Sequence, residues 1–215
     1  ASPKAERFVS PLAEPMGNPE YRLCDVQDPD SLDALFRRAE ERWGRLDFVI
    51  HSIAFAPLDD LHGRLTDSSS AGFNQAMDIS CHSFIRMARL AEPLMSDGGS
   101  LLCMTYHGAD QAVSHYGLMG PVKAALESST RYLATELGPE GIRVNAISPG
   151  PIRTRAASGL KDFEALATDG ETRSPLRRLA SVDDIGNTAA WLISEAGSAV
   201  TGGIHYVDAG HHIQF

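Results

Sequence analysis

Short apolar runs alternate with longer stretches that repeat their apolar residues at helical spacing, and this alternation limits the possible folds more than any other feature of the chain. The runs are four to six residues long, which suits strands better than helices. They lie at 46–50, 101–104, 142–147 and 204–207. Strands of this kind, separated by helices, are typical of a parallel sheet that is covered on both faces. We therefore predict an α/β fold, a doubly wound parallel sheet forming one domain over residues 1–215.

Capping and breaking residues set the expected ends of the other elements. Asp28 and Pro29 are suited to the N-cap and first position of a helix that Gly44 ends. Ser181 and Asp184 form an acidic capping box that opens a helix running to about 194. The remaining predictions are helices over 3–14, 66–95 (kinked at Pro93) and 116–137, a strand over 21–26, a loop over 54–65 and a helical lid over 155–175.

Tyr116 and Lys123 are the first candidate reactive groups. Seven residues of α-helix make almost two turns, so these two residues and Gly120 are expected to share one helix face. An ammonium group beside a phenol would lower the phenol pKa from its usual value of about 10. Such a tyrosine could donate a proton or stabilise an oxyanion near neutral pH. A core tyrosine followed by a solvated lysine has the same spacing, so the pair alone leaves a purely structural interpretation open.

Composition excludes several classes of protein. The formal net charge of −9 argues against nucleic acid or an anionic membrane as a partner, because both require a basic surface. No apolar run approaches the roughly 20 residues that span a bilayer, and no signal peptide opens the sequence, so we expect a cytoplasmic protein. Cys24, Cys81 and Cys103 match no metal or disulfide spacing and are expected to be reduced thiols. The adjacent His211 and His212 are expected to lie in a solvated tail, and no metal site is predicted.

Five segments together resemble the short-chain dehydrogenase/reductase family and, within it, the bacterial enoyl-acyl-carrier-protein reductases. The resemblance extends from about residue 4 to the C-terminus. It is carried by the spacing of Tyr106, Tyr116 and Lys123, by His51-Ser-Ile-Ala-Phe-Ala-Pro57, by Met119-Gly120, by Pro151-Ile-Arg-Thr154 and by 156–163. The fold implied is Rossmann-like, and the implied function is the enoyl reduction of type II fatty acid biosynthesis. Implied partners are an enoyl thioester on acyl carrier protein and three further copies in a homotetramer.

Catalytic roles follow from the resemblance. It implies hydride transfer from a nicotinamide cofactor, NADH in preference to NADPH, to the β-carbon of the enoyl thioester. Tyr116 is then expected to hydrogen-bond the thioester carbonyl oxygen, and Lys123 to hold the nicotinamide ribose and bias Tyr116 electrostatically. Tyr106 is expected to line the site beside the acyl chain or to help place the substrate.

Binding residues are carried over in the same way. The cofactor contacts implied are Asp25, Val26, Ser52, Ile53, Ala54, Lys123, Ile152 and Thr154. The apolar acyl pocket implied is formed by Phe55, Ala56, Leu61, Met119, Ala156 and Phe163. Two of the polar residues in this region have a structural alternative. Asp25 could be a turn or cap aspartate instead of an adenine contact. His51 is expected to be a buried histidine whose ring nitrogens are satisfied by hydrogen bonds.

The family's glycine-rich turn, where backbone N–H groups hold the pyrophosphate, has no counterpart among the 215 residues. By resemblance the sequence starts just after the second strand. We therefore expect the domain to lack its N-terminal strand-helix-strand unit, and these residues alone to bind the dinucleotide weakly and to be inactive. A scaffold protein without a cofactor is the competing interpretation.

The reaction class is the last expectation. Carbonyl reductases of the wider family place a serine thirteen residues before the active tyrosine, and here that position is Cys103. Their asparagine for a relay water is also missing from 77–80. Both departures favour reduction of a carbon–carbon double bond, with a 3-ketoacyl reductase as the alternative. Ala54, Gly117 and Pro121 differ from common family members and affect only the expected local geometry.

Overall fold

A four-stranded parallel sheet lies at the centre of the computed structural model, which describes residues 3–16, 20–153 and 163–214. The strand order is β1 (Phe48–His51), β2 (Gly99–Met104), β3 (Ile142–Pro149) and β4 (Ile204–Val207). Each neighbouring pair is parallel, so all four carboxyl ends lie at one edge of the sheet. The predicted parallel sheet is confirmed.

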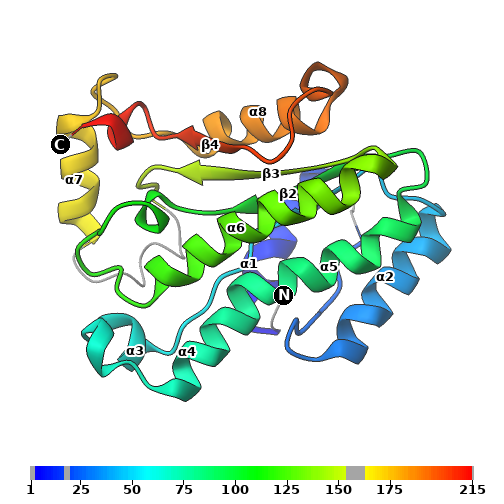
Figure 1. Ribbon diagram of the computed structural model, residues 1–215, viewed down its shortest axis with the longest axis horizontal. Helices are drawn as coiled ribbons and strands as arrows, with labels where there is room; N and C mark the ends of the chain where they lie inside the picture. The colour runs from blue at the N-terminus through cyan, green and yellow to red at the C-terminus, as the bar shows by residue number, and fades with distance from the viewer. Residues whose placement is uncertain (1–2, 17–19, 154–162, 215) are drawn as a thin grey trace.

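Helices cover both faces of this sheet, as the alternation of side chains in β2 shows. Leu101 and Cys103 belong to the core that includes α5 (Ser83–Ala91) and α6 (Met119–Leu137). Leu102, between them, points to the opposite face and packs with α8 (Val182–Ile193). Figure 1 shows α6 and α8 on either side of β3 and β4. The doubly wound arrangement is therefore confirmed.

Two other helices, α2 and α8, begin and end close to where capping residues predict. α2 (Pro29–Trp43) begins at Asp28, whose side chain accepts from Asp30 N, and is followed by Gly44 with a φ of 72°. Both hydrogen bonds of the Ser181–Asp184 capping box are formed at the start of α8. The remaining α-helices are α1 (Pro3–Ala13), α3 (Leu58–His62), α4 (Ser70–Met77) and α7 (Phe163–Arg173). None of the described helices is long and apolar enough to cross a membrane.

Three predicted elements are corrected. Residues 21–26 form no strand; their backbone groups bond to side chains instead, with Asp25 N donating to Ser31 Oγ and Val26 O accepting from Arg86 Nη2. The predicted loop over 54–65 contains α3. The long helix expected over 66–95 is divided into α4 and α5 by a π-helical turn over 78–82, and only its end, at Glu92–Leu94, reflects the predicted break at Pro93.

The π-helical turn binds a segment 25 residues earlier in the chain. Ser80 Oγ accepts from Phe55 N at 2.9 Å and donates to Phe55 O at 3.1 Å, so the turn binds the loop that follows β1. Ser83 Oγ donates to Ile79 O at 2.6 Å. The extra residue that a π-turn adds to a helix thus aims Ser80 at the loop, and such turns often occur at functional sites.

His51, the last residue of β1, is fully buried, as expected, but it is only partly satisfied, because its Nδ1 has no hydrogen-bond partner among the described residues. Its Nε2 lies 2.6 Å from Ser83 Oγ, whose single proton is used on Ile79 O, so His51 donates this hydrogen bond. Burial, together with the Lys123 charge, lowers the pKa of His51 to about 4. The ring is therefore neutral in the folded protein at pH 7.

This histidine predicts an acid-sensitive stability. The unfolded chain binds the proton below pH 6.5 and the folded chain only below about 4, so stability should fall as the pH drops through that window, by up to about 3 kcal/mol. Urea unfolding across the window should show a flatter profile for His51→Gln than for the parent. Equal slopes for the two proteins would contradict this assignment.

Candidate active site

The loop after β2 carries Tyr106 to the carboxyl edge of the sheet, where open α/β folds bind ligands. Thr105 N donates to Ile147 O at 2.8 Å, which extends the β2–β3 ladder by one bond and fixes the backbone just before Tyr106. Thr105 Oγ1 donates to Glu127 Oε1 of α6 at 2.7 Å. The Tyr106 hydroxyl is buried and has no hydrogen-bond partner among the described residues, so its donor is unused.

Tyr116 lies in a turn just before α6, and not within the helix as the sequence predicted. Its neighbours His115 and Gly117 have φ values of 62° and 37°, a backbone conformation that costs energy for a non-glycine residue and is common at functional sites. The rings of Tyr116 and Tyr106 are 4.7 Å apart. Gly108 permits this packing, because a Cβ there would lie 2.6 Å from Tyr116 Cδ1.

Lys123 is buried, whereas the structural alternative was a solvated lysine. Its side chain donates to Met104 O at 2.7 Å, and burial lowers its pKa. The pKa of Tyr116 is raised by burial, with Tyr106 and Glu127 adding to the effect. The predicted lowering of the Tyr116 pKa by Lys123 is therefore wrong in the protein without ligands. Tyr116 is a neutral phenol at pH 7 and can donate a hydrogen bond.

A largely apolar cavity of about 650 Å³ opens beside the tyrosines at the sheet edge. It brings together nine of the residues that the sequence assigned to the site. These are Ala54, Phe55, Ala56, Leu61, Tyr106, Tyr116, Met119, Ile152 and Phe163. The segments after β1, β2 and β3 and the helix α7 thus meet around one cavity, which we call the acyl cavity after the acyl pocket that the resemblance implies.

Sequence reasoning missed six residues that line the acyl cavity: Leu58, Thr105, Pro149, Gly150, Pro151 and Leu166. Leu58 and Leu166 lie three residues from Leu61 and Phe163, so helical spacing was a signal that could have found them. Gly150 has a steric requirement, because a Cβ there would lie 2.9 Å from Asp208 Cα. The loop after β3 therefore packs directly on the loop after β4.

The other predicted site residues lie outside this cavity. Asp25 accepts from Gln27 N at 3.0 Å in an exposed turn, which is the structural alternative considered for it. Val26, Ser52, Ile53 and Lys123 are not among the residues that line the cavity. Thr154 and Ala156, as well as most of the predicted lid before α7, fall outside the described residues.

Cys103 occupies the position at which carbonyl reductases use serine, and the structure turns it away from the acyl cavity. It is fully buried against α6, with Sγ 3.4 Å from Thr130 Oγ1. Burial raises the pKa of its thiol to about 12. Cys103 therefore cannot hydrogen-bond a substrate carbonyl beside Tyr116.

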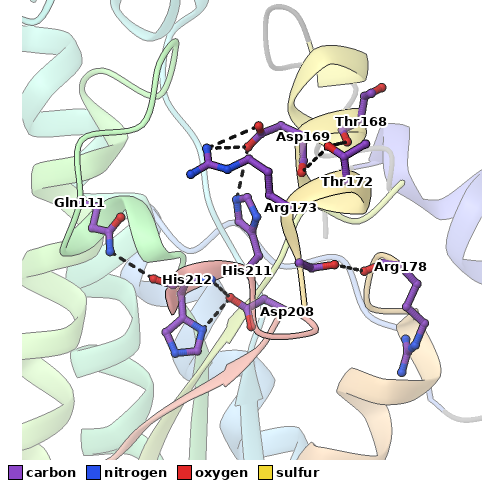
Figure 2. A network of polar contacts seen from close by, with 10 residues as sticks. Gln111, Thr168, Asp169, Thr172, Arg173, Arg178, Asp208, His211 and His212 are labelled. Atoms are coloured by element: carbon purple, nitrogen blue, oxygen red, sulfur yellow. Dashed lines mark hydrogen bonds and ion pairs between the residues drawn. The ribbon is translucent and has the colours of Figure 1, made fainter. Parts of the chain in front are cut away.

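The expectation of a solvated histidine tail is wrong for His211, whose side chain is buried. The Asp208 carboxylate accepts from Gly210 N, His212 N and His212 Nδ1 at 2.7–2.9 Å and folds the segment after β4 into a tight turn (Figure 2). No group of three or more possible metal ligands occurs in the described part of the chain.

Comparison with known proteins places these features in context. The family model described as "Enoyl-(Acyl carrier protein) reductase" matches residues 1–212. Enoyl-acyl-carrier-protein reductase (NADH) 1 of Rhizobium meliloti is 50% identical over 207 residues, which are 96% of this chain and 76% of that protein. The NADH-dependent enoyl-acyl-carrier-protein reductase of Nostoc sp. is 45% identical, over 98% of this chain and 81% of its own length.

Solved structures that are similar to this chain also belong to enoyl-acyl-carrier-protein reductases. The Anaplasma phagocytophilum enoyl-acyl-carrier-protein reductase in complex with NAD has a TM-score of 0.93 and 47% identity, over 99% of this chain and 81% of that chain. The Bacillus cereus enoyl-acyl-carrier-protein reductase with NADP+ and an indole naphthyridinone has a TM-score of 0.95 and 42% identity, over 100% of this chain and 84% of that one.

Proposed function

Since this chain belongs to the enoyl-(acyl carrier protein) reductase family, we propose that Tyr106, Tyr116 and Lys123 form its catalytic site and that the acyl cavity holds the substrate chain. The protein is an NADH-dependent oxidoreductase of fatty acid biosynthesis that reduces the carbon–carbon double bond of an enoyl thioester carried on acyl carrier protein. When bound, the nicotinamide supplies the hydride.

The residues around Lys123 suit the nicotinamide ribose. Among the described residues the Lys123 ammonium has one hydrogen-bond acceptor, Met104 O, so two of its three N–H groups remain for the ribose hydroxyls. A buried cation with so few partners is costly, and an added acceptor would offset that cost. Ala54 and Ile152, at the mouth of the acyl cavity, are suited to contact the nicotinamide ring.

The two tyrosines suit the reacting thioester. Addition of hydride to the β-carbon moves negative charge to the carbonyl oxygen, and a neutral Tyr116 phenol can stabilise that charge with a hydrogen bond in a poorly solvated site. The unpartnered Tyr106 hydroxyl supplies a second donor for placing the thioester. Apolar walls that include Phe55, Leu61 and Phe163 exclude water and contact the acyl chain.

One observation carries this reaction class: two phenols at an apolar cavity, with the carbonyl-reductase position held by a buried Cys103. The protein expressed from its natural gene should oxidise NADH with crotonyl thioester at least about 100-fold more efficiently than with acetoacetyl thioester, a difference of roughly 3 kcal/mol. Steady-state absorbance assays measure both rates. The reverse preference would assign the protein to the ketoreductases. Absence of activity with both substrates would favour the interpretation as a scaffold protein.

We also propose a homotetramer in the cytoplasm. Exposed apolar side chains on helices, among them Phe73 of α4 and Trp43 of α2, are suited to contacts between subunits. The thiols of Cys81 and Cys103, which form no disulfide, are consistent with a reducing compartment. Light scattering at micromolar concentration should report four copies. A monomer under these conditions would contradict the proposed assembly.

A further inference from the structure

The turn after β4, residues 208–212, lies between the loop that carries Tyr106 and the helix α7, and we call it the histidine turn. Its shape is set by Asp208, whose buried carboxylate accepts three hydrogen bonds from residues 210 and 212. This satisfied carboxylate makes the turn a rigid support. Gly210 lets the turn approach the end of α7 closely, because a Cβ there would lie 2.9 Å from Pro175.

His211 contacts both neighbours of the histidine turn. Its ring lies edge-on to His107, with centroids 5.6 Å apart, and His107 in turn lies 4.4 Å from the ring of Tyr106. On the other side, His211 Nε2 is 3.9 Å from Asp169 Oδ2 of α7 (Figure 2). The buried side chain of His211 therefore lies between α7 and the loop that carries Tyr106, and sets the distance between them. Gln111 Nε2 donates to His212 O at 3.3 Å, which is a second contact between the histidine turn and the segment that follows Tyr106.

The helix α7 depends on such links. It contributes Phe163 and Leu166 to the acyl cavity, yet only Ala167 and Gly170 of its eleven residues are buried. The Arg153–Glu164 ion pair, which also touches α7, is exposed on both sides and should contribute little. Arg173 Nη1 lies 3.4 Å from Asp169 Oδ2 on the same helix, so Asp169 is shared between a local partner and His211.

We propose that His211 is a positioning residue for enoyl reduction: by holding Asp169 of α7 at a fixed distance from the Tyr106 loop, it sets the depth of the acyl cavity and hence the preferred acyl chain length. This inference rests on the proposed function. Phe163 and Leu166 of α7 line part of the acyl cavity, and we expect a long acyl chain to contact this wall more than a short one does. The effect of His211 should therefore grow with chain length.

Two substitutions separate the roles of the ring and of its nitrogen. His211→Phe keeps the ring and removes the polar atom that faces Asp169, whereas His211→Gln keeps a polar group of similar reach. His211→Phe should change, by about fivefold and mostly through KM, the ratio of kcat/KM for dodecenoyl thioester to kcat/KM for crotonyl thioester. His211→Gln should restore most of the parent ratio. Asp169→Asn should reproduce the effect, and the double variant should be no worse than either single one. His205→Ala, on β4 against Trp191, is the matched control and should leave the ratio unchanged.

Hydrogen exchange of residues 163–173 supplies a readout that does not depend on activity. His211→Phe should speed exchange in α7 while leaving β2 and β3 protected, as expected for a local loss of support. Unchanged exchange, equal losses for both chain lengths, or additive effects of His211→Phe and Asp169→Asn would each overturn the inference. If the parent protein reduces neither thioester, the proposed function fails, and the exchange comparison still decides whether His211 positions α7.

Discussion

Lys123→Met should lower kcat/KM for enoyl thioester reduction by about 100-fold or more while leaving the free energy of unfolding unchanged or slightly higher. The lysine is buried with one hydrogen-bond acceptor among the described residues, so its charge costs desolvation energy in the folded protein without ligands. Methionine fills a similar volume without that cost. Steady-state kinetics and urea unfolding of the same preparations measure the two effects.

If Lys123 were solvated, stability would also be kept, because an exposed lysine contributes little to folding. Because Lys123 is in fact buried, stability is expected to be kept through the removal of an unfavourable charge. Arg131→Met, at an exposed cation of the same helix, is the matched control and should retain activity. A Lys123→Met variant with parental turnover would contradict the proposed catalytic role of Lys123. A variant that unfolds several kcal/mol more easily would show that the role of Lys123 is structural.

Tyr116→Phe should reduce kcat by about 100- to 1000-fold and change KM much less, because phenylalanine keeps the ring packing and loses only the hydrogen bond to the developing oxyanion. The ring of Tyr116 packs on Tyr106 at 4.7 Å and fills the space left by Gly108, and both contacts survive the substitution. Single-turnover and steady-state rates with crotonyl thioester measure the loss.

Tyr106→Phe is the informative companion variant, since it removes a hydroxyl that is buried and unpartnered among the described residues. It should raise stability slightly and reduce activity less than Tyr116→Phe does. Tyr132→Phe, at an exposed ring of α6, controls for the loss of a phenol as such. If Tyr106→Phe costs more activity than Tyr116→Phe, the roles of the two tyrosines would have to be exchanged.

The sheet could be predicted from the sequence because each strand is an apolar run bounded by residues with a clear local meaning. The segment 21–26 has a similar apolar pattern but no strand beside it in the described structure, and pairing between distant segments is not visible in a local pattern. The division of the predicted helix over 66–95 into α4 and α5 could not be predicted for a related reason. A serine that binds the Phe55 backbone produces the π-helical turn, and that contact spans 25 residues of sequence.

Much of the site could also be predicted, because parallel strands bring their carboxyl ends to one edge. Nine of the assigned residues line one cavity, and two more were signalled by helical spacing. The sequence could not show that Lys123 is buried or that burial dominates the pKa of Tyr116, since both depend on packing from several elements. The buried His211 was missed because a chain end rich in polar residues is usually solvated.

The position to which the hydride is delivered tests the central claim most directly. NADH carrying deuterium at C4, supplied with crotonyl thioester and the protein in ordinary water, should give a butyryl thioester with deuterium at the β-carbon and a solvent proton at the α-carbon, as read by NMR. This is the outcome required if Tyr116 stabilises charge on the thioester oxygen while the double bond is reduced. Deuterium at a carbinol carbon with acetoacetyl thioester, and none in the crotonyl product, would contradict the account.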